Sequence, residues 1–207
     1  MMLSRRTFVA AALLVAAPSL ALAEDSAWNP ETPYDTDIVI GSEKAPVTVV
    51  EYASLTCPHC GRFHNESFPA FKKGWIDTGK AKLVFRHLPL DQSALAAALT
   101  VSCVPQAGRA DLLAAFFSSV SEWAPKQDLA PVVARTLGDS VKMDDVMACI
   151  SKDGFPKAVM QPGTDAVNNG VDATPTFFVG GVKLVGFQTP EALGKAVDDA
   201  IARKVLD

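Results

Sequence analysis

The stretch Cys57-Pro58-His59-Cys60 decides the fold, because its two thiols stand between segments of different pattern. A nearly continuous apolar run, Ala45–Ala53, precedes it and predicts a buried strand. Residues 61–78 follow it with aromatic side chains at helical spacing, which predicts a helix with one apolar face. The two thiols are therefore expected where a strand ends and a helix begins.

A helix start changes the chemistry of a thiol. The first backbone N–H groups have no partner within the helix, and the helix dipole adds partial positive charge, so both favour the thiolate. Cys57 is expected to be the exposed sulfur of low pKa, with Cys60 as its disulfide partner. Pro58 suits the first turn because it has no N–H to lose, and a protonated His59 adds positive charge beside the thiolate. A stabilised thiolate stabilises the reduced form, which makes the pair an oxidant of other thiols.

The Cys-x-x-Cys spacing is also compatible with two other kinds of site. Half of a zinc site is the first, but a zinc ribbon needs a second close pair, and Cys103 and Cys149 are far apart in the sequence. A purely structural local disulfide is the second, but it does not need a strand-to-helix junction. The pattern favours a redox pair over both.

The composition and net charge of the chain argue against some classes of binding partner. The chain has 207 residues, of which 49% are apolar, enough for a sizeable core. Its formal net charge is −4, and no basic cluster follows the N-terminus. Nucleic acid and anionic membrane surfaces are therefore not expected as partners.

Residues 1–23 predict an export signal. Arg5 and Arg6 form a positive region, residues 8–17 are apolar, and Ala21-Leu22-Ala23 fits a cleavage site. An uncleaved membrane anchor is the alternative, although the apolar run is short for a membrane span. The two arginines also resemble the twin-arginine pattern, so the choice between the Sec and Tat routes stays open. Export places the cysteines where disulfides persist.

Three titratable residues near the thiols need an interpretation. Glu51 interrupts the apolar strand, and a buried carboxylate is costly unless it has a role or a partner. It either exchanges a proton with Cys60 or lies near an edge of the sheet or pairs with a cation. His64 is expected to be a surface or capping histidine, and His87 a structural one.

A second strand is expected at Ala81–Leu88, and a short one around Asp37–Ile40. The next 75 or so residues read as helix, interrupted at residues 105–108, near Pro125 and at Gly138-Asp139. The expected helices are Ser93–Cys103, Ala110–Ser121, Leu129–Leu137, Met143–Ser151 and Pro156–Asn169.

The C-terminal part carries a second informative stretch. Thr174-Pro175 opens a strand of aromatic and β-branched residues that ends at Val179. Gly180-Gly181 predicts a two-residue hairpin turn, with Val182–Val185 as the partner strand. A helix over Pro190–Val205, with Thr189 as its N-cap, ends the chain.

Cys103 and Cys149 are expected to form a structural disulfide. Both lie in apolar helical stretches without the electropositive context of Cys57, and exported chains seldom keep two free thiols when a partner is near. The bridge would close a loop of about 45 residues. The alternative is two free, buried cysteines that act as small apolar residues.

This order of elements is that of a thioredoxin fold. At residues 51–60 the chain resembles the DsbA family of periplasmic thiol oxidoreductases, whose active-site tetrapeptide is Cys-Pro-His-Cys. The resemblance covers the whole mature chain and implies an α/β thioredoxin fold with an inserted all-helical domain. The implied domains are residues 24–90 and 166–207 for the thioredoxin-like parts and 91–165 for the insertion.

The resemblance also implies roles for single residues. Cys57 would be the nucleophilic cysteine that bonds to substrate, and Cys60 the resolving one. Glu51 falls where the family has a buried acidic residue. Pro175 resembles the cis-proline that faces the nucleophile, with Thr174 before it in place of the Val of the best-known members. The pair Cys103 and Cys149 is one that many members lack.

The function implied is that of an exported dithiol–disulfide oxidoreductase in the periplasm. It would donate the Cys57–Cys60 disulfide to reduced, partly folded exported proteins. A quinone-linked membrane protein of the DsbB type would reoxidise it. A monomer without bound cofactor or resident metal is expected.

Three other functions stay open. The closest is a disulfide isomerase or reductase on the same scaffold, although about 20 residues before the first firm strand are too few for a dimerisation domain. A copper-handling thiol chaperone is another, but no Met- or His-rich neighbourhood surrounds Cys57 and Cys60. The third is a non-enzymatic chaperone, which would not need the tetrapeptide.

Overall fold

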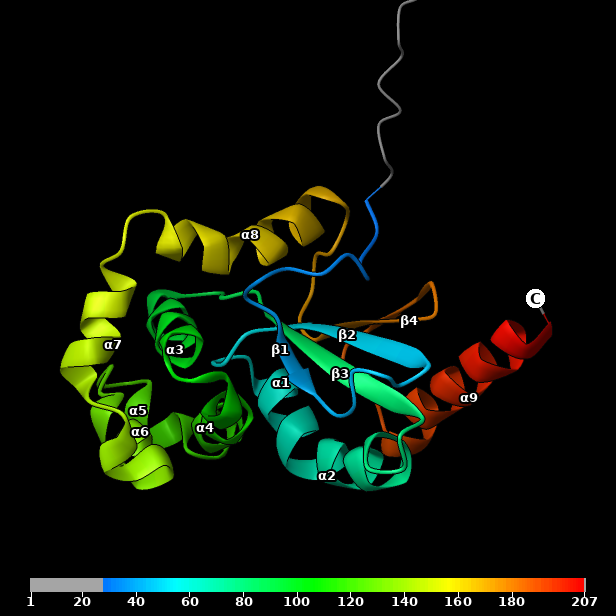
Figure 1. Cartoon of the computed structure of the whole chain (residues 1–207), viewed down its shortest axis with the longest axis horizontal. Helices are drawn as coiled ribbons and strands as arrows, with labels where there is room; N and C mark the ends of the chain where they lie inside the picture. The colour runs from blue at the N-terminus through cyan, green and yellow to red at the C-terminus, as the bar shows by residue number, and fades with distance from the viewer. Residues whose placement is uncertain (1–27, 207) are drawn as a thin grey trace, which may run out of the picture.

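A five-stranded sheet forms the centre of the protein in a computed structural model that describes residues 28–206. The export signal expected over residues 1–23 lies outside the described residues. The strand order is β1-β3-β2-β4-β5 (Figure 1). The strands are β1 (Ile38–Ile40), β2 (Val47–Ala53), β3 (Ala81–His87), β4 (Thr176–Val179) and β5 (Val182–Val185).

Strand β2 lies in the middle of this sheet. It runs parallel to β3 and antiparallel to β4, and all its residues except Thr48 are buried. Glu51 is opposite Phe85 on β3 and Phe177 on β4. The suggestion that Glu51 lies near an edge of the sheet is therefore wrong. Because β2 lies between β3 and β4, the loop that carries Cys57 begins between these two strands. Residues next to both strands can therefore contribute to a site there.

The helical stretch after Cys57 alternates between α and π turns. It consists of α1 (Pro58–Arg62), η1 (Phe63–Ser67), α2 (Phe68–Phe71) and η2 (Lys72–Ile76), where η1 and η2 are π-helical. Pro69 has no N–H for the preceding turn, and the wide η1 turn stands where that bond would be missing. The sequence predicted one kinked helix here, and the structure instead has two wide turns within a continuous helical run.

Helices cover both faces of the sheet (Figure 1). On one face, Phe63 and Phe71 of the first helical stretch pack with Leu193 and Val197 of α9 (Pro190–Leu206). Thr189 Oγ1 accepts a hydrogen bond from Ala192 N at 3.2 Å, as expected of an N-cap. On the other face, buried residues of the sheet pack with Ala166 near the end of α8 (Phe155–Asn168) and with Trp28 of the N-terminal arm, which is residues 28–37. The sheet is thus the middle layer of three.

Six α-helices stand between β3 and β4 in the chain, together with the 3₁₀ helix η3 (Gly138–Ser140). The α-helices are α3 (Gln92–Cys103), α4 (Gln106–Ser118), α5 (Val120–Trp123), α6 (Ala130–Leu137), α7 (Met143–Ile150) and α8. The break predicted between two helices at residues 105–108 is shorter than expected: Val104 and Pro105 separate α3 from α4, and α4 begins at Gln106. Helix α8 runs across the domain boundary predicted at residue 165, and the extents of the domains stay a prediction.

A disulfide joins two of these helices. Cys103 at the end of α3 and Cys149 in α7 are bonded, with an S–S distance of 2.14 Å and α-carbons 5.8 Å apart. The alternative of two free cysteines is therefore wrong. The bond connects residues separated by 46 positions in the chain, so it constrains most of the helical insertion.

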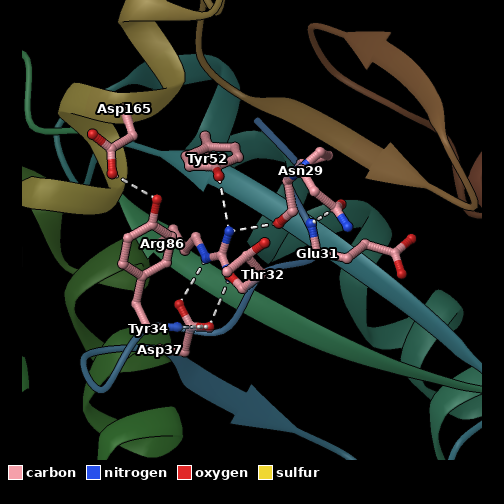
Figure 2. A network of polar contacts seen from close by, with 9 residues as sticks. Asn29, Glu31, Thr32, Tyr34, Asp37, Tyr52, Arg86 and Asp165 are labelled. Atoms are coloured by element: carbon pink, nitrogen blue, oxygen red, sulfur yellow. Dashed lines mark hydrogen bonds and ion pairs between the residues drawn. The ribbon is translucent and has the colours of Figure 1, made fainter. Parts of the chain in front are cut away.

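A buried arginine fixes the N-terminal arm to the sheet (Figure 2). The Arg86 guanidinium on β3 donates to both carboxylate oxygens of Asp37, at 2.7 and 2.8 Å. It also donates to the Tyr52 hydroxyl on β2 and to the carbonyl oxygens of Pro30 and Thr32. The charge is thus paired and hydrogen-bonded, as burial requires.

The same arm reaches α8. The Tyr34 hydroxyl donates to Asp165 Oδ2 at 2.7 Å, and the Tyr34 ring lies 4.6 Å from the Arg86 guanidinium (Figure 2). Burial and the hydrogen bond with Asp165 raise the pKa of Tyr34 to about 12. The arm therefore connects the sheet to the helix that leads into Thr174 and Pro175.

Candidate active site

Cys57 lies at the junction that the sequence predicted. It is the N-cap residue of α1, with φ −72° and ψ 123°, and Pro58 takes the first helical position. The expectation that Cys57 is exposed is wrong, because only 6% of the residue is accessible. Pro58 and His59 beside it are exposed.

The loop before β4 contacts Cys57. The Thr174–Pro175 peptide bond is cis, and the carbonyl oxygen of Thr174 lies 3.3 Å from Cys57 Sγ, where the thiol form donates to it. These two residues are separated by 117 positions in the chain. The loop thus places a backbone acceptor directly at the sulfur that the sequence singled out as reactive.

The surroundings of Cys57 favour its thiolate. A hydrogen bond from the Cys60 thiol is the largest cause that lowers the pKa of Cys57 from an ordinary 9.0 to about 5. The Thr174 side chain and the backbone N–H groups of Cys60 and His59 act in the same direction, while burial opposes them. His59 therefore acts here through its backbone, and its side chain is exposed.

Cys60 has the opposite character. It is fully buried, and burial is the largest cause that raises its pKa. The hydrogen bond with Cys57 and the negative charge of Glu51 raise it further. Near neutral pH the pair therefore holds one thiolate at Cys57 and one thiol at Cys60 that donates to it.

A buried pair of titratable side chains stands next to these cysteines. His64 Nε2 lies 3.1 and 3.0 Å from the two carboxylate oxygens of Glu51, and both side chains are almost fully buried. The prediction that His64 is a surface or capping residue is wrong. A usable indication was present in the sequence, because His64 follows Cys60 by four positions and so shares its helix face.

The loop before Cys57 is tied to the helical insertion by residues that the sequence analysis did not single out. The Thr56 hydroxyl donates to Asp91 Oδ2 at 2.6 Å and lies 3.2 Å from the Ser54 hydroxyl. The other oxygen of Asp91 accepts from Ala94 N at 2.8 Å and so caps α3. Asp91 thus holds the start of α3 and the loop of the reactive sulfur together.

Comparisons with known proteins agree with this geometry. The model of a family described as thioredoxin matches residues 34–199. A protein-disulfide oxidoreductase of Rickettsia felis is 31% identical over 174 residues, which are 81% of this chain and 61% of the relative. The crystal structure of alpha-DsbA1 from Wolbachia pipientis superposes with a TM-score of 0.74 at 31% identity, covering 84% of this chain and 95% of that one.

The chain belongs to the DsbA-type thioredoxin family. The thioredoxin fold with a helical insertion, inferred from resemblance, is confirmed. Disulfide bond formation protein D of Bacillus subtilis is a further relative, 24% identical over 172 residues. The chain spans about three fifths of the length of the first Rickettsia relatives that it matches.

An apolar groove adjoins the redox pair of this DsbA-type chain. It encloses about 200 Å³ and is lined by residues of three segments: Leu88, Leu90, Val167, Val171, Asp172, Ala173 and Thr174. Leu90 and Val167 are 63% and 53% exposed, and together they give the groove an apolar rim. Thr174 belongs both to the groove and to the surroundings of Cys57. Thr174 therefore lies between the groove and the reactive sulfur.

The third histidine of the chain, His87, lies in the core. His87 is 3% exposed, its Nε2 has no hydrogen-bond partner, and burial followed by the charge of Arg109 lowers its pKa to about 3. This neutral ring fits the structural role expected of it.

Within residues 28–206, no group of three or more His, Cys, Asp or Glu side chains is arranged to hold a metal ion. None of the described helices has the length and apolar character to cross a membrane.

Proposed function

We propose that the protein is an exported dithiol–disulfide oxidoreductase that donates the Cys57–Cys60 disulfide to reduced proteins. The observation that carries this proposal is the contrast between the two thiols: the pKa of Cys57 falls to about 5, whereas that of Cys60 is raised. A dithiol that holds a stabilised thiolate favours its reduced form, so its disulfide oxidises other thiols. The relatives named protein-disulfide oxidoreductase support the same activity.

The reaction follows from the accessibility of the two sulfurs. A substrate thiolate attacks Cys57 Sγ, because Cys60 is fully buried. The Cys57–Cys60 bond breaks, a mixed disulfide forms at Cys57, and the electron pair goes to Cys60, whose raised pKa makes it take up a proton. A second substrate thiolate then attacks the substrate sulfur of the mixed disulfide. Cys57 leaves as the stabilised thiolate, and the substrate carries the new disulfide.

The surroundings of Cys57 suit a partly folded polypeptide as substrate. The Thr174 carbonyl can accept a backbone N–H from an extended segment beside the mixed disulfide. The apolar groove next to it can take a side chain that a folded protein would bury. Thr174 and Pro175 would position the substrate, and Glu51 would act on the proton of Cys60.

The partners and the location complete the proposal. The export signal over residues 1–23 would bring the chain to the periplasm by the Sec or Tat route. A quinone-linked membrane protein of the DsbB type would reoxidise the Cys57–Cys60 dithiol, and the protein would act as a monomer. The second candidate, an isomerase or reductase on the same fold, would need the dithiol rather than the disulfide form.

Oxidation of a reduced protein with two cysteines tests the proposal. The oxidised protein should form the substrate disulfide stoichiometrically, and Cys57→Ser should abolish the reaction. Cys60→Ala, whose Cys57 thiolate has no partner cysteine, should attack a disulfide-bonded form of the same substrate and accumulate a mixed disulfide at Cys57, detectable by mass. The variant Cys103→Ala/Cys149→Ala, which keeps the Cys57–Cys60 pair, is the matched control and should still react. Rearrangement of a scrambled substrate by the dithiol form, without net oxidation, would favour the isomerase.

A further inference from the structure

A short segment, residues 88–91, connects β3 to the helical insertion and passes beside the loop that carries the reactive sulfur. Leu88 N donates to the Ala53 carbonyl oxygen at 2.8 Å, and Leu90 N donates to Ser54 Oγ at 3.3 Å. Two backbone groups of the segment are therefore bonded to the start of that loop.

Two hydroxyl groups extend this contact to the residue before Cys57. The Thr56 hydroxyl donates to Asp91 Oδ2 at 2.6 Å, so the Ser54 hydroxyl, 3.2 Å from Thr56 Oγ1, donates to Thr56. Ser54 Oγ in turn accepts from Leu90 N. The bonds thus run in one direction, from Leu90 N through the two hydroxyls to the carboxylate. The last bond is the strongest of them, because its acceptor is a carboxylate.

The carboxylate that ends this chain of bonds is held in place by α3. The second oxygen of Asp91 accepts from Ala94 N at 2.8 Å and caps the helix. The other end of α3 is bonded to α7 through the disulfide of Cys103 and Cys149. Asp91 cannot turn away from Thr56 without giving up the cap, so it is a fixed acceptor for that hydroxyl.

The segment held in this way carries part of the wall of the apolar groove. Leu88 and Leu90 line the groove together with Val167 and residues 171–174. Leu88 packs with buried residues of the sheet, whereas Leu90 is 63% exposed. The position of Leu90 therefore depends on the hydrogen bonds around its backbone more than on packing of its side chain.

We propose that Thr56 and Asp91 are positioning residues that act through Leu90, and that their hydrogen bond makes the protein select substrates with an apolar side chain beside the reacting cysteine. The inference rests on the proposed function and deepens it. Thr174 lies between the groove and the sulfur, so a polypeptide bonded to Cys57 can place a neighbouring side chain against Leu90. A small thiol makes no such contact, and its rate should not depend on the bond.

Substitutions at both ends of the bond separate it from the helix cap. Thr56→Val keeps the shape of the side chain and removes the hydroxyl, while Thr56→Ser keeps a hydroxyl. Asp91→Asn keeps an acceptor for the cap, but its amide nitrogen cannot accept from Thr56. Thr136→Val is the matched control, because the Thr136 hydroxyl donates to a carbonyl of its own helix, that of Val132.

The assay compares two reduced peptides and one small dithiol. Each peptide has two cysteines, and the first is flanked by leucine in one peptide and by serine in the other. The oxidised protein is mixed with either peptide or with dithiothreitol, and loss of the Cys57–Cys60 disulfide is followed by acid quench and alkylation. In every reaction this disulfide becomes a dithiol and the added dithiol becomes a disulfide. The ratio of the two peptide rate constants measures selectivity, and the intrinsic reactivity of the peptides cancels between variants.

We expect the wild type to favour the leucine peptide. Thr56→Val should lower the selectivity ratio about fivefold, and Asp91→Asn should lower it as well. Thr56→Ser and Thr136→Val should keep the ratio, and the rate with dithiothreitol should be the same in all these proteins. In a Leu90→Ser background, Thr56→Val should change the ratio no further, because the bond acts through Leu90. Asp91→Asn is the decisive variant if Thr56→Val does not fold.

An unchanged ratio in Thr56→Val would overturn the inference, and so would a wild type that reacts equally with both peptides. An equal fall in the rates with the leucine peptide and with dithiothreitol would overturn it too, because the bond would then act on the sulfur rather than on the substrate. The proposed function fails by a different result: neither peptide reduces the wild-type disulfide, although dithiothreitol does.

Discussion

The thiolate of Cys57 should stabilise the folded, reduced protein in a pH-dependent way. The perturbation is Cys57→Ser, which keeps the size of the side chain and removes a thiol whose pKa is lowered from 9.0 to about 5. Between these two pKa values the unfolded chain binds more protons than the folded one. The contribution of the Cys57 thiolate to the free energy of unfolding therefore grows as the pH rises. It is lost as the pH falls through about 5, where the folded protein also takes up the proton.

The size of the effect follows from the two pKa values. Integrating the linkage between pH 5 and pH 7, the thiolate adds about 2 kcal/mol to the free energy of unfolding. The raised pKa of Cys60 does not enter in this range, because an unfolded thiol is also protonated below about pH 8. Other titrating groups, His87 among them, contribute equally to the wild type and to the variant. The difference between the two proteins therefore isolates Cys57.

Urea unfolding under a phosphine reductant measures this difference. The wild type and Cys57→Ser are unfolded at about pH 5, 6, 7 and 8, and the free energies are compared at each pH. We expect the difference to increase by about 2 kcal/mol from pH 5 to pH 7 and to increase further at pH 8. A difference that stays constant over this range would refute the argument, since it would mean that the Cys60 thiol, Thr174 and the helix start do not favour the thiolate.

Three further predictions concern stability. Replacing Cys103 and Cys149 by Ala should lower the free energy of unfolding by about 4 kcal/mol, from the 46-residue separation that the bond spans; an unchanged urea midpoint would contradict this. Because burial lowers the pKa of His87 to about 3, unfolding should become easier by about 2.5 kcal/mol as the pH falls from 7 to 4.5, and His87→Leu should flatten that dependence. Arg86→Met should cost about 3 to 5 kcal/mol by leaving the Asp37 carboxylate without its partner, whereas loss of Asp37 and Arg86 together should cost less than the two single changes added, as a double-mutant cycle of urea unfolding would show.

The local pattern of apolar residues in the sequence predicted most of the strands and helices. The apolar run before Cys57 and the aromatic strand after Pro175 were long and well bounded, and both strands lie where the sequence predicted them. The π turns around Pro69 were not predictable, because their hydrogen bonds depend on how the helix packs on the sheet. The start of α4 was missed because Gly108 suggested a turn, whereas it lies inside the helix.

The candidate site likewise has features that the sequence predicted and features that depend on tertiary structure. The tetrapeptide and its position at a helix start pointed to the reactive thiols without knowledge of the tertiary structure. The burial of Cys57 could not be predicted, since it depends on tertiary contacts such as that with Thr174, a residue distant in the chain. The same holds for the contact of Thr56 with Asp91. His64 was misjudged because it was considered as a single residue rather than as a neighbour of Cys60 on one helix face.

The equilibrium of the Cys57–Cys60 pair with glutathione is the most direct test of the central claim, that a stabilised thiolate makes this disulfide an oxidant. The reduced fraction is measured by acid quench and alkylation over a range of glutathione ratios. We expect a midpoint potential less negative than about −180 mV, towards the −120 mV or so of the strongly oxidising DsbA. A midpoint near the −270 mV or so of thioredoxin would contradict the claim, because the pair would then be a reductant.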